Sequence, residues 1–112
     1  MGYKIKSRIW VELNGEEFLG EGKVQLLKAI DETGSLSKAA KAINLSYKKA
    51  WHLMDSVNKT AIKPVTINSI GGKGGGGTEL TPYGKSLILV FEEMNKKCWN
   101  FLDVQLKKIK DL

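Results

Sequence analysis

Apolar and polar residues alternate along the first part of the chain, a pattern typical of a half-buried strand. The apolar positions of this alternation are Tyr3, Ile5, Ile9, Val11 and Leu13. The dipeptide Asn14-Gly15 follows and favours a type I′ hairpin turn. Phe18 and Leu19 then fit a short returning strand. Residues 1–19 are therefore expected to form an N-terminal strand or hairpin.

The next pattern, over residues 22–32, is helical. Val24, Leu27 and Ile30 fall on one stripe at spacings of three. Gly34 follows where a helix often needs a left-handed residue just past its end. The spacing therefore predicts a helix that packs through this stripe and stops before the glycine.

Two short helices joined by a tight turn come next. Ser35 is a suitable N-cap for a helix that runs to about Ile43. Ser46 is a suitable N-cap for a helix over residues 47–60. Together with the preceding helix they predict a three-helix, helix-turn-helix core over residues 22–60.

The third helix of this core divides into two faces at 100° per residue. The residues expected to face the core are Ala50, Leu53, Met54 and Val57. The residues on the opposite side are Lys48, His52, Asp55 and Lys59. Tyr47 and Lys49 lie at the N-terminal end, which in helix-turn-helix proteins meets base edges. Tyr47 fits either a DNA contact or the edge of the core, and for Trp51 partial burial is favoured over a DNA contact.

A β-branched, apolar run over residues 65–70 predicts a strand. Residues 71–77 are glycines apart from Lys73, and residues 78–80 can return as a second strand. The glycine run matches a dinucleotide-binding pattern, but any run of glycines matches it. That motif also requires a helix that opens directly at its end, and none is expected here. A hairpin over residues 65–81 whose tip approaches phosphates is favoured, and a tip without a role is the alternative.

The remainder, residues 82–112, predicts one long helix with Thr81 as N-cap and Pro82 at its first position. The first apolar stripe consists of Leu87, Phe91, Met94, Cys98 and Phe101. The second consists of Trp99, Leu102, Leu106 and Ile109. Two stripes on one helix favour packing against a partner subunit. The expected dimer interface contains Phe91, Met94, Cys98, Trp99, Phe101, Leu102, Leu106 and Ile109.

These elements predict a mainly α fold with a small β component. The expected architecture is a winged helix-turn-helix with an N-terminal strand or hairpin and a long C-terminal dimerisation helix. A length of 112 residues suits a single domain over residues 1–112.

The charge of the chain is unevenly placed. Its net charge is +6, from 18 basic and 12 acidic residues. Residues 35–85 contain eight lysines and two acidic residues, so this segment holds all of the excess. Such a segment is typical of a polyanion-binding surface, and a lysine-rich solvated surface is the alternative.

Other kinds of protein fit the sequence poorly. No window approaches the roughly 18 apolar residues that span a bilayer, and the charged start of the chain is not that of a signal peptide. Cys98 is the only cysteine, so no internal disulfide forms and a cytoplasmic location is expected. His52, the only histidine, joins no carboxylate cluster. We therefore expect neither a catalytic site nor a metal or cofactor site, and we do not expect the protein to be an enzyme.

The chain resembles the N-terminal DNA-binding domain of the molybdate-responsive ModE family of transcriptional regulators, which has a LysR-like helix-turn-helix. The matching segments are Gly34-Ser35-Leu36-Ser37 with Ala39-Ala40, Ser46-Tyr47-Lys48 with Ala50-Trp51, and Gly71 to Gly77 followed by Leu80-Thr81 and Tyr83-Gly84. The resemblance implies a homodimer that binds an inverted-repeat operator. It gives no basis for oxyanion sensing by these 112 residues, because the family's C-terminal oxyanion-binding modules have no counterpart here.

The sequence thus predicts a dimeric, sequence-specific regulator that binds duplex DNA. Residues expected to read or flank bases are Tyr47, Lys48, Lys49 and His52. Residues expected at the DNA backbone are Ser35, Ser37, Lys38, Lys73 and Lys85, with Ser46 and Lys59 also at the interface. The alternatives are an interaction module that works with a separate effector-sensing protein and a non-specific architectural DNA binder.

Overall fold

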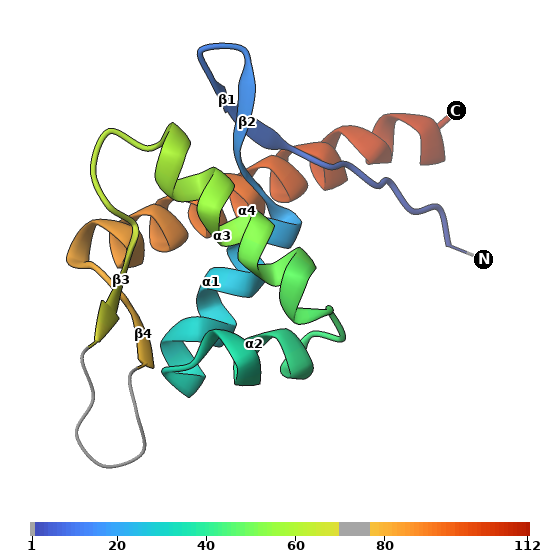
Figure 1. Ribbon diagram of the computed structural model, residues 1–112. Helices are drawn as coiled ribbons and strands as arrows, with labels where there is room; N and C mark the ends of the chain where they lie inside the picture. The colour runs from blue at the N-terminus through green and yellow to red at the C-terminus, as the bar shows by residue number, and fades with distance from the viewer. Residues whose placement is uncertain (1, 70–76) are drawn as a thin grey trace.

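The computed structural model describes residues 2–69 and 77–112, which contain eight helices and strands (Figure 1). The strands are β1 (Trp10–Leu13), β2 (Glu16–Gly20), β3 (Thr66–Ser69) and β4 (Gly77–Leu80). The helices are α1 (Glu21–Thr33), α2 (Leu36–Ala42), α3 (Tyr47–Thr60) and α4 (Pro82–Lys110). The expected mainly α fold with a small β component is confirmed. Three helices followed by a hairpin give the order of a winged helix-turn-helix, in which β3 and β4 form the wing.

The core lies between α1, α2 and α3 and continues under β2 and the first half of α4. Leu27, Ile30 and Val57 are among its largest fully buried side chains. The expected core face of α3 is confirmed: Ala50 and Val57 are buried, and Leu53 and Met54 pack half-buried against the same cluster. The opposite face of α3 is thereby left to solvent.

Local caps fix where α2 and α3 begin. The Ser35 hydroxyl oxygen accepts a hydrogen bond from the Lys38 amide at 3.2 Å. The Ser46 hydroxyl oxygen accepts one from the Lys49 amide at 3.1 Å. Gly34 ends α1 in the left-handed region, with φ of 68°. The expected helix starts are confirmed because each depends on residues within one turn of the cap.

The N-terminal hairpin is shorter than the alternation predicts. Asn14 and Gly15 both have positive φ, 55° and 83°, which confirms the type I′ turn. The first strand, however, begins only at Trp10, and residues 3–9 are extended without a strand partner. The reason is that β2 ends at Gly20, whose pairing with Trp10 is the last in the ladder. We call residues 3–9 the N-terminal arm.

The N-terminal arm lies along the C-terminal half of α4. The Ser7 hydroxyl is 4.0 Å from the Cys98 thiol. Ile5 lines two cavities together with Trp99 and Asp103 of α4. In Figure 1, α4 passes behind the helical core and extends beyond it, and both chain termini lie at that end. The face of α4 around Trp99 is therefore covered in part by the chain's own first residues.

This packing divides the interface expected on α4. Phe91 is only 3% exposed and belongs to the core of the single chain, which leaves its side chain almost no surface for a partner. Leu106 is also buried, and Cys98 and Leu102 are half-buried. The exposed members of the expected set are Met94, Trp99, Phe101 and Ile109. None of the helices described is long and apolar enough to cross a membrane.

The wing is joined to α4 at Thr81. The Thr81 hydroxyl oxygen caps α4 by accepting from the Gly84 amide at 3.0 Å. The Thr81 amide donates to the Val65 carbonyl at 3.0 Å. Pro82 occupies the first turn, so the expected start of α4 is confirmed. The end of the wing and the start of the long helix are thus held at one point.

Gly84 makes this junction sensitive to substitution. A Cβ on Gly84 would collide with the Val65 carbonyl oxygen and approach Val65 Cγ1 to 3.1 Å. Because the colliding atom belongs to the backbone, relief requires the wing and α4 to separate. We expect Gly84→Ala to lower the free energy of unfolding by about 1–3 kcal/mol in urea denaturation. Ser86→Ala, at an exposed position two residues on, is the control, and equal stability of both variants would contradict the expectation.

Candidate nucleic-acid interface

The exposed face of α3 is polar and lies opposite its core residues. Lys48 and His52 are exposed on this face. Lys59 is exposed as well, but its ammonium lies 2.9 Å from the Asp55 carboxylate one turn earlier. The structure therefore brings the expected residues together on one side of α3, with the charge of Lys59 already balanced by Asp55. The N-terminal end of this face remains basic.

One flank of α3 faces the wing. The Asn58 side chain accepts hydrogen bonds from the Val65 and Thr66 amides at 2.8 and 3.1 Å, and donates to the Thr66 hydroxyl at 2.8 Å. These three bonds fix the base of the wing against the C-terminal half of α3. Sequence reasoning missed Asn58, because nothing in its local sequence shows that its amide is matched to a strand eight residues away.

Aromatic residues at the start of α3 are largely exposed. Tyr47 is 57% exposed, so of the two places considered for it the structure favours the surface. Trp51 is 42% exposed and meets the His52 ring edge to face, with ring centroids 5.4 Å apart. A ring exposed to this extent is partly buried, as expected for Trp51, and it stands beside the polar face of α3.

The other flank of α3 faces the N-terminal hairpin. Lys49 lines a cavity of about 260 Å³ together with Arg8, Lys23 and Glu17. Lys23 is buried, and its ammonium donates to the Glu17 carbonyl oxygen at 2.5 Å. Neither Arg8 nor Lys23 was expected here. Both lie outside residues 35–85, in the part of the sequence whose positive and negative charges cancel. Only the fold brings them next to α3.

Helix α2 contributes the remaining residues expected at the DNA backbone. Ser37 and Lys38 are exposed in its first turn. The oxygens of Ser35 and Ser46 are engaged as caps, so these hydroxyls have only their hydrogens to offer a phosphate. Lys73, expected at the wing tip, lies outside the residues that the structure describes.

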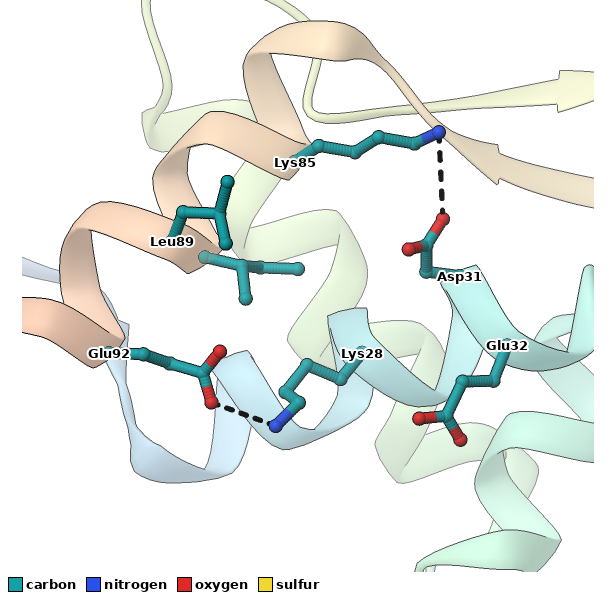
Figure 2. Close-up of a pocket in the computed structure, with 7 residues that line it drawn as sticks. Lys28, Asp31, Glu32, Lys85, Leu89 and Glu92 are labelled. Carbon is teal, nitrogen blue, oxygen red and sulfur yellow. Dashed lines mark hydrogen bonds and ion pairs between the residues drawn. The ribbon is translucent and has the colours of Figure 1, made fainter.

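The Lys85 side chain points toward Asp31 on α1. Its ammonium lies 4.0 Å from the Asp31 carboxylate, across a groove between α1 and α4 (Figure 2). A second ion pair crosses the same groove, from Lys28 to Glu92 at 2.8 Å. This hydrogen bond raises the pKa of Lys28 above its ordinary value. The structure therefore joins Lys85 to α1, where acidic side chains gather, rather than to the basic surface of α2 and α3.

The described surface around α2 and α3 carries charged and hydrogen-bonding side chains. Within residues 2–69 and 77–112, no three His, Cys, Asp or Glu side chains gather as a metal site would require. His52 stands beside an aromatic ring, and Cys98 lies on a different helix, half-buried near the N-terminal arm. The surface presents cations at the N-terminal end of α3 and polar side chains along the rest of its exposed face.

Comparison with known proteins finds several relatives of the chain. No protein-family model matches the chain. It is 38% identical over 85 residues to "Molybdenum transport protein ModE" of Azotobacter vinelandii, covering 76% of this chain and 32% of that protein. It is 45% identical over 73 residues to "Molybdenum-pterin-binding protein MopB" of Rhodobacter capsulatus, covering 65% and 27%.

A third relative has a more specific name. The chain is 37% identical over 82 residues to "DNA-binding transcriptional dual regulator ModE" of Escherichia coli strain K12, covering 73% of this chain and 31% of that protein. The chain thus spans about a third of the length of the relatives that it matches. With its winged helix-turn-helix order, this similarity over about three quarters of the sequence shows that the chain is related to the ModE-type transcriptional regulators.

Proposed function

We propose that this chain is a DNA-binding module that recognises specific duplex sequences as a homodimer and regulates transcription. The observation that carries the proposal is the exposed polar face of α3, with cations at its N-terminal end and the wing fixed to one flank by Asn58. A helix presented in this way fits the major groove while the wing reaches the adjacent backbone. A relative named as a DNA-binding regulator supports the same function.

The residues have different roles in this proposal. Lys48 and His52 lie on the outward face and contact base edges, with Tyr47 and Lys49 at the end of α3 that enters the groove. Ser37 and Lys38 at the start of α2 contact phosphates and fix register, together with Lys73. Lys59 contributes less, because Asp55 already neutralises it.

The homodimer forms through α4 in this proposal. Val90, Met94 and Phe101 are all exposed, and they fall within about 40° of one another around the helix axis. We call these three residues the α4 stripe. An exposed apolar stripe on a helix is typical of a subunit interface. A two-fold axis here would give each DNA half-site its own copy of α3.

Selection of duplex DNA from random and genomic pools by the purified protein tests the function. Enrichment of an inverted repeat with half-sites about one helical turn apart is the expected result. Binding of all duplexes with similar affinity would instead leave a non-specific architectural protein. Absence of any DNA binding would overturn the proposal in favour of an interaction module.

Lys48→Ala tests whether α3 reads bases. Because a side chain that bonds a base edge discriminates by about 1–3 kcal/mol, we expect this variant to lose preference at one position of each half-site. The measurement is repeated selection, together with affinities for the enriched repeat and for an unrelated duplex. Lys28→Ala, on the α1–α4 groove, is the control and should keep the preference. An equal loss of affinity for both duplexes in Lys48→Ala would assign Lys48 to the backbone.

A further inference from the structure

The cavity beside the first turn of α3 combines several positively charged groups. Arg8 comes from the N-terminal arm, Lys23 from the first turn of α1 and Lys49 from the first turn of α3, and all three line the same space of about 260 Å³. Glu17 is the single carboxylate among the lining residues. Three cations against one anion leave a local excess of positive charge, in a space that holds several water-sized groups.

Lys23 is the most unusual member of this set. It is 5% exposed, which is rare for a lysine. Of its three N–H donors, the structure assigns one to the Glu17 carbonyl oxygen, and the nearest Glu17 carboxylate oxygen is 3.6 Å away. Burying an ammonium costs less free energy when its remaining N–H donors are also hydrogen-bonded to a negative or polar group. The cavity therefore suits an anion that bonds to Lys23 beside Glu17.

The start of α1 adds backbone donors on the cavity side, while the carboxylate of its first turn, Glu21, is exposed and does not line the cavity. Its N-cap is Gly20, which has no side chain to accept from the first-turn amides. Gly22 and Lys23, in that first turn, both line the cavity. The uncapped N-terminus of a helix carries a partial positive charge and donates to phosphate-like anions. The charge of the helix end and the three cationic side chains thus converge from different elements.

We propose that this cavity binds a phosphate-class anion and that, in the DNA complex, a backbone phosphate occupies it. The choice of DNA as the source rests on the proposed function, because Lys49 lies at the end of α3 that enters the groove. The wing contacts the backbone on one flank of α3, and this cavity contacts it on the other. Arg8 is the residue best suited to hold the anion, since its guanidinium bonds two phosphate oxygens at once.

Arg8→Gln tests the proposal without disturbing the buried Lys23. Salt-dependent binding to the enriched repeat and to an unrelated duplex is measured by fluorescence anisotropy. We expect the variant to bind both duplexes about tenfold more weakly, and its slope of log affinity against log salt to fall by about 0.9. Lys28→Gln removes the same charge from another face of α1 and should leave the slope unchanged. Equal slopes in Arg8→Gln and wild type would overturn the backbone contact.

A second measurement separates this site from the proposed function. Inorganic phosphate is titrated into the free protein while the backbone amide signals of Gly22 and Lys49 are followed by NMR. Should the wild type bind no duplex, saturable shifts that disappear in Arg8→Gln would support an anion site supplied from solution. Absence of both these shifts and the change in salt slope would overturn the site itself.

Discussion

Replacing Asn58 by alanine is expected to lower the free energy of unfolding by about 3 kcal/mol, from three lost hydrogen bonds of about 1 kcal/mol each. The Asn58 amide group joins α3 to the base of β3 through bonds of 2.8 to 3.1 Å. Val65 is fully buried and Thr66 is 8% exposed, so water cannot easily replace the acceptor that their amides lose. The wing should then lose its fixed orientation relative to α3.

Chemical denaturation followed by circular dichroism measures this effect. Asn58→Asp keeps an acceptor for both strand amides and loses only the donor to the Thr66 hydroxyl. Its free energy of unfolding should therefore lie between those of the wild type and Asn58→Ala. Asn100→Ala, the same change at an exposed position of α4, is the control. A change below about 0.5 kcal/mol in Asn58→Ala, the range of ordinary surface substitutions, would contradict this role.

The helices at the interface could be predicted from the sequence because their signals are local. Ser46 caps α3 through an amide three residues away, and the periodicity of the next fourteen residues separates core from surface. Asn14-Gly15 likewise determined its own turn, since both residues take the positive φ that a type I′ turn requires. Signals of this range do not depend on how the rest of the chain folds.

Features that depend on distant contacts could not be predicted. Residues 3–9 alternate like a strand, but their conformation depended on the length of β2, which the alternation does not contain. Lys23 precedes the apolar stripe of α1, and only the packing of the hairpin buries it. The apolar stripe of α4 that contains Trp99 would have the same sequence pattern if it were covered by the chain's own N-terminal arm or by another subunit. Periodicity identifies an apolar face without identifying its partner.

Phe101→Asp is expected to separate the proposed dimer while leaving the single chain folded. Phe101 is 62% exposed on the α4 stripe, so in the monomer a carboxylate there remains in water. In a two-fold interface each substitution occurs twice. Loss of a central aromatic costs about 2 kcal/mol or more per copy, so the dimer dissociation constant should rise about a thousandfold.

Sedimentation equilibrium measures the dissociation constant, and circular dichroism checks that the helices remain. Leu89→Asp is the matched control, because Leu89 is also exposed on α4, at 69%, but lies about 120° from Phe101 around the helix. Affinity for an inverted repeat should fall in Phe101→Asp and persist in Leu89→Asp, since linking two half-site contacts raises the effective concentration of the second. A Phe101→Asp protein that stays dimeric would place the interface elsewhere. The covered face around Trp99 would then be the next surface to test, by removing the N-terminal arm that lies on it.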